Sequence, residues 1–333
     1  MGKRIYAKRT LSHLLLLLML THCSQKSETY EEQIMIKGGL IIQTGWNSTA
    51  DEDIENGFVL IEKGKIKQVV IWSDTISYPK KTKIIDANGK YIVPGLIDGF
   101  AVINNQAFVH TTRYSLDIAP ENMAKSVANE PFSDQLDSPK WKYYQYLSSI
   151  DVTDSVVLKY AKKLGSANSH LMPTLSLLYL DLLRHENPWN DPLADLINAN
   201  DINNRADKVS GNHNYSKEVQ AAYTNLALKV LELEQQYYRK GAKYLTGSAC
   251  DVWGTMPGIS LHAELELLQK IGLTDRQILA SASANFSDAF GWKKGKIAEG
   301  YDADILILDE NPLENIENLK KINLLLLKGE VIS

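Results

Sequence analysis

The histidines and acidic residues of this chain form none of the short patterns that mark a metal site. No two of its seven histidines make a His-x-His pair, and no His-Glu-x-x-His motif is present. A Gly-x-Ser-x-Gly elbow, a phosphate-binding loop and a dinucleotide fingerprint are also missing from the sequence. A metal site would therefore need ligands that converge from distant segments, and the candidates are Asp251, His110 and His170.

Each candidate also has a structural interpretation. Asp251 follows the strand-like segment 243–248, and a shift of register would bring its carboxylate into a site; otherwise it is a loop carboxylate or a helix cap. His110 ends a strand-like run and is either a displaced ligand or a structural residue. His170 precedes a strand-like segment, and His262 lies in a predicted helix, where packing is the better interpretation. We take Asp251 as the candidate catalytic residue.

The first residues resemble an export signal. A positive start, with Lys3 and Arg4, precedes the apolar run Leu14–Leu20, which is too short to span a bilayer. Leu20-Thr21-His22-Cys23 then resembles the lipobox of bacterial lipoproteins, although that pattern prefers a small residue where His22 stands. We expect a signal peptide over 1–22, lipid on Cys23, a polar tether over 23–32 and a membrane-anchored location in the cell envelope. An ordinary cleaved signal with an incidental cysteine is the alternative.

The composition indicates a folded protein. Hydrophobic residues make up 44% of the 333 positions and charged residues 23%, with a formal net charge of −4. The sequence shows no basic cluster beyond its first ten residues, so nucleic acid is not an expected partner. Beyond Cys23 only Cys250 remains, so no internal disulfide can form, and Cys250 is expected to be a small buried side chain.

The two ends of the chain are predicted to be rich in β-structure and the middle to alternate between helices and strands. The N-terminal part contains a strand with a Gly38-Gly39 break, a hairpin around Lys63-Gly64-Lys65 and two strands flanking Asn88-Gly89. Two apolar runs, 303–309 and 322–333, end the chain. We therefore predict one composite β domain from 33–95 and 298–333, beside an α/β domain over 96–297.

Helix signals in the middle are local and specific. Thr153 and Ser216 are predicted N-caps, Gly165 and Gly241 predicted ends, and Thr274 to Gln277 forms a capping-box signature. Two segments, 119–140 and 185–214, are predicted loops. The candidate barrel strands lie near 93–98, 102–109, 145–150, 169–176 and 243–248.

Longer motifs carry a family resemblance. "IIDANGKYIVPGLID", "GISLHAELELLQKIGLTDRQILASASANFSDAFG" and "GKIAEGYDADILILDENPLENIENLKKINLLLLKGEVI" together resemble the metal-dependent amidohydrolase superfamily, in its imidazolonepropionase-like and prolidase-like branch. The resemblance implies a (β/α)8 barrel with one or two divalent metal ions, and a small β-sandwich built from both termini. It also implies hydrolysis of C–N bonds in amides or lactams by a metal-bound water at the carboxyl ends of the strands.

The same resemblance identifies what this chain lacks. The family's His-x-His pair follows Pro-Gly-Leu-Ile-Asp, but here Asp98 is followed by Gly99, Phe100 and Ala101. The family's late Gly-Thr-Asp aligns with Gly247-Ser248-Ala249, so a methyl group replaces the carboxylate. About 190 residues separate Leu96 from Ala289, whereas a full barrel needs about 250. We therefore expect an incomplete or distorted barrel and little tightly bound zinc, with Asp98 in a structural role.

Three hypotheses follow. The first is a hydrolase of non-peptide C–N bonds in a small-molecule substrate, with weakened or lost metal chemistry. The second is a non-catalytic cell-envelope lipoprotein that uses the scaffold for binding. The third is a decayed or internally deleted gene product without a stable barrel.

Overall fold

The computed structural model describes residues 33–99, 108–109, 116–128, 137–166, 170–181, 192, 216–249, 255–256 and 258–332. The chain divides into Met1–Glu32 and a compact unit, Gln33–Ser333, which holds all of these residues. The structural statements below concern the described residues, so the candidates Asp251, Cys23 and His110 lie outside them.

A four-stranded sheet comes entirely from the N-terminal part. Its order is β4-β3-β1-β5, where β1 pairs antiparallel with β3 and parallel with β5. The predicted hairpin is confirmed, because β3 and β4 are joined by Lys63 and Gly64, both with positive φ (54° and 72°). The bounds are β1 Ile34–Lys37, β3 Gly57–Glu62, β4 Lys65–Ile71 and β5 Lys83–Asp86.

A five-stranded sheet joins the two ends of the described chain. Its order is β12-β11-β10-β6-β2, and the central pair, β6 with β10, runs antiparallel from Tyr91 opposite Leu308 to Pro94 opposite Ile305. Residues more than two hundred positions apart are therefore hydrogen-bonded neighbours. The bounds are β2 Leu40–Ile41, β6 Tyr91–Pro94, β10 Ile305–Leu308, β11 Ile322–Leu327 and β12 Glu330–Val331.

Strand β10 shows why the five-stranded sheet lies between two cores. Its sequence, Ile-Leu-Ile-Leu, is buried at every position. Ile305 and Ile307 belong to the hydrophobic cluster shared with the four-stranded sheet, whereas Leu306 and Leu308 belong to the cluster shared with the helices. Since successive strand side chains point to opposite faces, an uninterrupted apolar strand fits a sheet that is covered on both sides.

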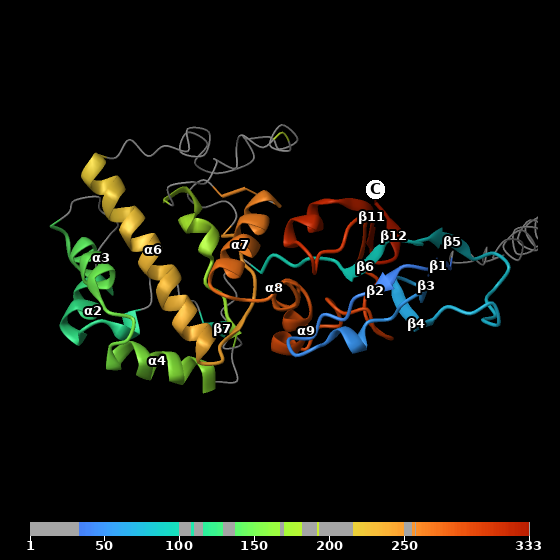
Figure 1. Cartoon of the computed structure of the whole chain (residues 1–333), viewed down its shortest axis with the longest axis horizontal. Coiled ribbons are helices and arrows are strands. Elements are labelled where there is room, and N and C mark those ends of the chain that lie inside the picture. Colours follow the sequence, from blue (N-terminus) through green and yellow to red (C-terminus); the bar gives the residue numbers. More distant parts are fainter. Residues whose placement is uncertain are drawn as a thin grey trace, which may run out of the picture. The chain divides into compact units, whose positions relative to one another are not determined.

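The helices form the rest of the unit (Figure 1). The longest, α6, begins after Ser216, whose Oγ accepts a hydrogen bond from the Val219 backbone N–H at 3.3 Å, as predicted. Gly241, with φ 95°, follows its end. The capping box of Thr274 and Gln277 at α8 is also confirmed. The bounds are α2 Glu121–Ala128, α3 Pro139–Ser149, α4 Ser155–Ser166, α6 Lys217–Arg239, α7 Ile259–Lys270, α8 Asp275–Ser281 and α9 Ala284–Phe290.

Three short parallel strands form the third sheet, in the order β7-β8-β9. They are β7 Phe108–Val109, β8 His170–Leu171 and β9 Lys243–Tyr244. The α/β class is confirmed, and in the part of the chain that the structure describes no sheet closes into a barrel.

One of the predicted barrel strands is wrong, and another is shorter than predicted. Segment 145–150 lies mostly in α3, because Trp141, Tyr144 and Leu147 recur every three residues and bury one helical face. Segment 169–176 keeps only two strand residues before the chain turns into the 3-10 helix Leu175–Asp181.

The prediction for α4 was also wrong in detail. The side chain of Thr153 donates to Asp151 at 2.7 Å instead of capping the helix, which begins at Ser155. Gly165 lies inside α4 and does not end it. A Cβ atom there would overlap the Lys240 carbonyl oxygen, so this glycine lets the end of α6 approach closely. The predicted loop 119–140 contains α2, and the predicted loop 185–214 lies almost entirely outside the described residues.

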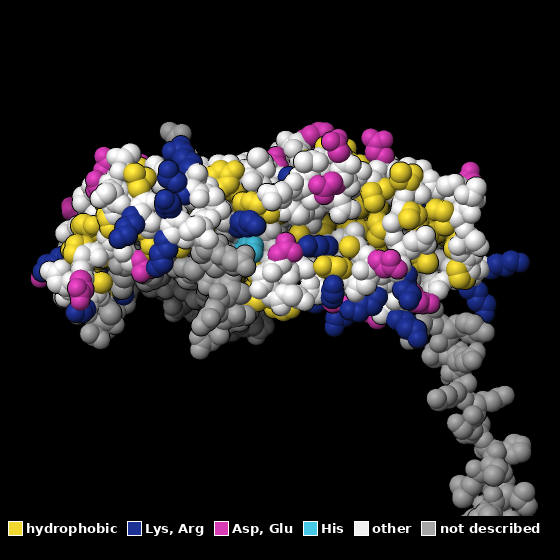
Figure 2. Space-filling view, turned by 90° about the horizontal axis from the view of Figure 1, so that it is seen from below, with side chains coloured by type: hydrophobic (Ala, Val, Ile, Leu, Met, Phe, Trp, Pro, Cys, Tyr) yellow, Lys and Arg dark blue, Asp and Glu magenta, His cyan; other side chains and the backbone are white. Residues whose placement is uncertain are grey.

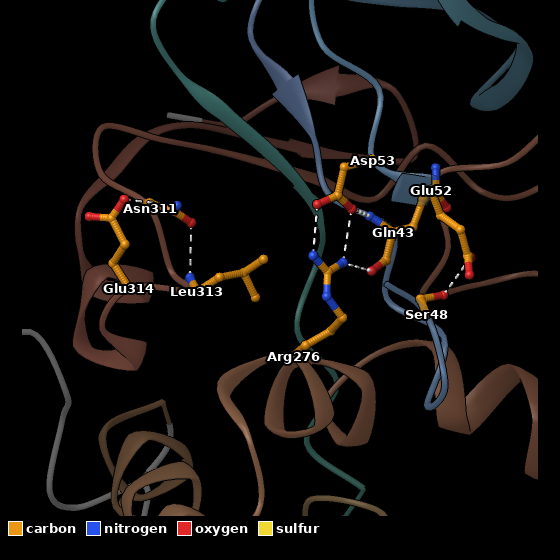
Figure 3. A network of polar contacts seen from close by, with 8 residues as sticks. All are labelled: Gln43, Ser48, Glu52, Asp53, Arg276, Asn311, Leu313 and Glu314. Atoms are coloured by element: carbon orange, nitrogen blue, oxygen red, sulfur yellow. Dashed lines mark hydrogen bonds and ion pairs between the residues drawn. The ribbon is translucent and has the colours of Figure 1, made fainter. Parts of the chain in front are cut away.

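A buried ion pair connects helix α8 to the N-terminal strands (Figure 3). Arg276 donates to both carboxylate oxygens of Asp53, at 2.9 and 2.7 Å, and to the Gln43 carbonyl at 2.7 Å. The backbone N–H of Gln43 completes the arrangement by donating to Asp53 at 2.8 Å. The side chains of Arg276 and Asp53 are only 14% and 7% exposed, so each charge depends on the other for solvation.

No helix in the described ranges combines the length and the apolar composition that crossing a membrane requires.

Candidate functional site

The carboxyl ends of three strand segments run side by side at the position where the resemblance predicts an active site. The Gly99 N–H donates to the Thr246 carbonyl at 3.0 Å, and the Leu245 N–H donates to the Leu171 carbonyl at 2.8 Å. The Thr246 hydroxyl adds a 2.7 Å bond to the Ile97 carbonyl. Residues that follow β6, β8 and β9 are therefore neighbours, as expected for strands that deliver side chains to one shared end.

Asp98 links two of these strand ends through hydrogen bonds. One of its carboxylate oxygens accepts a hydrogen bond from the Ser248 backbone N–H at 2.8 Å, and the other accepts from the Ser248 hydroxyl. Charge-assisted bonds of this kind are stronger than neutral ones. The geometry agrees with the structural role expected for Asp98, because both oxygens face the neighbouring strand.

The polar contacts continue from Ser248 to a buried glutamate. Ser176 donates its hydroxyl to the Ser248 carbonyl at 2.8 Å and its backbone N–H to Glu264 Oε2 at 2.7 Å. Glu264 lies on α7 and is fully buried. Its other oxygen, Oε1, has no hydrogen-bond partner among the described residues. Asp98, Ser248, Ser176 and Glu264 thus form one network across three strand ends and a helix, hereafter called the strand-end network.

Burial raises the pKa of Glu264 well above the usual value for a glutamate. Desolvation is the largest cause, the Ser176 N–H opposes it, and the negative charge of Asp98 adds to it. Burial therefore favours the neutral form of this carboxyl group.

Two residues at the same strand ends have unusual backbone conformations. Thr174 and Ala249 have φ of 51° and 49°, in the left-handed region that β-branched residues and alanine rarely adopt. Both side chains are fully buried. Strain of this kind clusters at functional sites and persists where the surroundings impose it. Ala249 therefore combines a strained backbone beside the strand-end network with a methyl side chain.

Apolar side chains fill the space beside Gly99. A Cβ atom on Gly99 would lie 2.5 Å from the Phe286 ring and 2.6 Å from the Met172 methyl group. A Cβ on Gly247 would lie 2.8 Å from the Met172 sulfur. Met172, Phe286 and Leu245 form a buried hydrophobic cluster. No larger side chain fits at position 99 without displacing them.

The described residues do not fit the metal that the resemblance implies. Gly99 offers no ligand and no room for one, and Ala249 presents a buried methyl group. Across the described ranges no three or more histidine, cysteine or acidic side chains gather where they could hold a metal ion. A divalent ion needs oxygen, nitrogen or sulfur donors, which this apolar surface does not supply.

The structure describes two of the candidate histidines, His170 and His262. His170 begins β8, four residues before Thr174, so it lies near the opposite end of that strand. Burial lowers the pKa of His170, and the charge of Lys243 lowers it further, against a smaller effect of Asp288. His262 is half-buried on α7. Asp251 and Cys250 lie outside the described residues, so the prediction for Asp251 stays a prediction.

Sequence reasoning missed Glu264, Ser176 and Ser248. A signal for Glu264 was present, because Leu261, Glu264, Leu265 and Leu268 share one helical face, where a carboxylate interrupts an otherwise apolar stripe. No comparable signal marks the two serines, whose role depends on neighbours distant in the sequence.

Comparison with known proteins agrees with this geometry. Residues 194–332 match the model of the amidohydrolase family. The resemblance to the amidohydrolase superfamily is confirmed. No curated protein matches the chain.

Solved structures of prolidase-like amidohydrolases share the fold. A structure assigned to a prolidase of Bifidobacterium longum has a TM-score of 0.57 and 15% identity, covering 90% of this chain and 94% of its own. A Xaa-Pro dipeptidase with bound methionine gives 0.52 and 13%, covering 91% and 100%. The ochratoxinase of A. niger gives 0.52 and 15%, covering 91% and 96%. At these identities the likeness concerns the fold, which for amidohydrolases is of the (β/α)8 type.

Proposed function

We propose that this amidohydrolase-family chain derives from hydrolases of non-peptide C–N bonds and that its metal chemistry is weakened or lost. The observation that carries the proposal is position 99, the first residue after Pro-Gly-Leu-Ile-Asp, where Phe286 and Met172 leave no room for a larger side chain. The buried methyl group of Ala249 is a second, independent departure. If the chain is active, its substrate is a small molecule.

Elemental analysis of zinc-loaded, desalted protein tests this proposal. We expect far less than one zinc per chain. Changing a single residue that supports the metal ligands weakens metal binding about 10–100-fold, so the loss of several direct ligands should abolish it. Asp251→Ala is the informative variant, and Asp74→Ala, on an exposed loop, is its control. Near one zinc per chain that disappears only with Asp251→Ala would overturn the proposal, since a relocated site would then exist.

Activity gives a second readout. Amides, lactams and Xaa-Pro dipeptides cover the family's C–N chemistry and the substrate named for one of the similar structures. We expect turnover far below that of an intact relative and unchanged by added zinc. Zinc-dependent turnover at the level of such a relative would contradict the proposal.

The alternative is a non-catalytic lipoprotein of the cell envelope that uses the scaffold for binding. A groove of about 390 Å³ between α3 and α6 favours it, because its volume falls in the range of small-molecule sites. Its lining combines aromatic and polar side chains, including Trp141, Tyr144, Gln145 and Asn225. A ligand that raises the melting temperature of the zinc-free protein, and loses the effect with Asn225→Leu, would support this function.

Lipid attachment at Cys23 remains part of the proposal, with a location at the bacterial envelope membrane and no nucleic-acid partner. The support is the short leucine run that ends near Cys23 and the polar residues after it. Cys23→Ala should release the chain from the membrane fraction, whereas Cys250→Ala should leave it there. Unchanged membrane association of Cys23→Ala would rule out this anchor.

We also propose that the two sheets form the family's composite β-sandwich. Their shared hydrophobic cluster, with Ile36 and Val59 from one sheet and Ile92 and Ile305 from the other, supports this assignment.

A further inference from the structure

Six lysines from two segments of the sequence meet at one end of the four-stranded sheet. Lys63, Lys65 and Lys67 belong to the β3–β4 hairpin, and Lys80, Lys81 and Lys83 precede or begin β5. The strand register brings the segments to the same end, since Ile34 pairs with Ile61 on β3 and with Lys83 on β5. Four adjacent strands span about 14 Å, so the two groups are near neighbours. These six residues are called the lysine end of the sheet.

The chain enters the sheet between the two groups. The Gln33 side chain donates to Glu62 at 2.9 Å, next to the hairpin. On its other side, Gln33 accepts hydrogen bonds from the Thr82 hydroxyl at 3.4 Å and, through its carbonyl, from the Lys83 backbone N–H at 2.8 Å. Residue 33 is therefore fixed at the lysine end, and the chain that precedes it continues from there.

The lysine end is exposed and carries a net positive charge. All six lysines are exposed. Segments 62–67 and 80–83 contain six lysines and a single acid, Glu62, which accepts from Gln33 and forms an ion pair with Lys67 at 3.4 Å. Asp302 approaches the same end but pairs with Lys65 and Lys294. Figure 2 shows lysine and arginine side chains gathered along one border of the surface over the sheets.

We propose that the lysine end docks on the anionic headgroups of the membrane that holds the lipid anchor. This inference rests on the proposed lipid at Cys23. Only nine residues, 24–32, separate Cys23 from Gln33, and the ten fully extended steps between these two residues reach about 35 Å. The anchor therefore lets the lysine end reach the bilayer, where each lysine near an anionic surface favours that surface by about five-fold.

The test uses the purified lipidated protein in vesicles. Its lysines are acylated with a water-soluble reagent that does not cross membranes, and each site is quantified by mass spectrometry. In vesicles of phosphatidylcholine with phosphatidylglycerol, the lysine end should react about five-fold more slowly than in vesicles of phosphatidylcholine alone. Raising the salt concentration should remove the difference, because the Debye length falls to about 3 Å at 1 M.

Charge-neutralising variants supply the matched comparison. Lys80→Gln, Lys81→Gln and Lys83→Gln together should abolish the slower reaction of Lys63 and Lys67. Lys159→Gln, Lys162→Gln and Lys217→Gln, at exposed positions on α4 and α6, should preserve it. Equal reaction rates in the two kinds of vesicle would overturn the proposal. Slower acylation of the lysine end in cell envelopes but not in phosphatidylglycerol vesicles would indicate another partner for this surface. That outcome would also overturn the proposal.

Failure of the anchor itself is distinguishable. The mass of the peptide that carries Cys23 shows whether lipid is attached, independently of any lysine. If Cys23 carries no lipid, the same labelling is done on the unlipidated chain with vesicles added. Slower reaction of the lysine end with phosphatidylglycerol present would then support the docking surface alone, and unchanged reaction would reject it.

Discussion

Buried acidic groups are partnered differently in two regions of the molecule, the ion pair between Arg276 and Asp53 and the strand-end network. Arg276 and Asp53 form a bidentate pair. The Gln43 backbone adds two hydrogen bonds, because its N–H donates to Asp53 and its carbonyl accepts from Arg276. In the strand-end network, Glu264 is fully buried, has a raised pKa and has one oxygen without a hydrogen-bond partner in the part of the chain that the structure describes. The first arrangement is a completed structural contact. The second combines an acid whose pKa is raised with strained backbone at Thr174 and Ala249.

Breaking the completed contact should give the largest effect. Arg276→Ala leaves the Asp53 charge buried without its cation, so the free energy of unfolding should fall by about 3–5 kcal/mol. Lys320→Ala is the control, because its ion pair with Glu317 is about half exposed and should contribute at most about 0.5 kcal/mol. Urea denaturation measures both. A loss under about 1 kcal/mol for Arg276→Ala would show that water reaches Asp53 easily.

Adding one methyl group at the filled position should come next. Gly99→Ala places a Cβ against Phe286 and Met172, and overpacking of this kind costs about 1–3 kcal/mol. Combining it with Phe286→Leu should recover part of the loss. Gly45→Ala is the matched control, since its Cβ would meet only the Ser48 hydroxyl, which can rotate away. If Gly99→Ala folds as stably as the parent, the cluster is loose enough to admit a ligand side chain.

The pH dependence of stability tests the buried acid. The pKa of Glu264 is raised in the folded state, so between about pH 4.3 and that raised pKa the folded chain holds a proton that the unfolded chain has lost. Stability should therefore fall as pH rises across this window, by about 1.4 kcal/mol per pH unit from this group. Glu264→Gln should remove that slope, and Glu266→Gln, half-exposed on the same helix, should keep it. An unchanged slope in Glu264→Gln would mean that the carboxyl group is ionised in the fold.

Relieving the strained backbone should give the smallest effect. Ala249→Gly removes the Cβ that disfavours φ 49°, and it should stabilise the fold by about 0.5–1 kcal/mol. Ala280→Gly, inside α8, should destabilise by a similar amount because its conformation is helical. Thermal unfolding compares the two. Destabilisation by Ala249→Gly would mean that the methyl group contributes more through packing than its conformation costs.

Local chemistry made most of the two ends of the chain predictable. The Gly38-Gly39 break and the Lys63-Gly64 turn each depend on a few adjacent residues, and the structure confirms them. The middle was less predictable. Segment 145–150 contains Tyr146 and Ile150, which favour strands, but packing of Trp141 against Tyr223 of α6 selects a helix.

The sequence by itself determined the α/β class, the resemblance to amidohydrolases and the loss of ligand side chains at Gly99 and Ala249, because residue identity and order are enough for these conclusions. Only the tertiary structure decided that Met172 and Phe286 fill the space beside Gly99 and that Glu264 joins Asp98 through two serines. It alone brought the two lysine-rich segments of the lysine end together. The physical reason is that packing, burial and charge clustering depend on distances between residues far apart in the chain, which strand register and helix docking set.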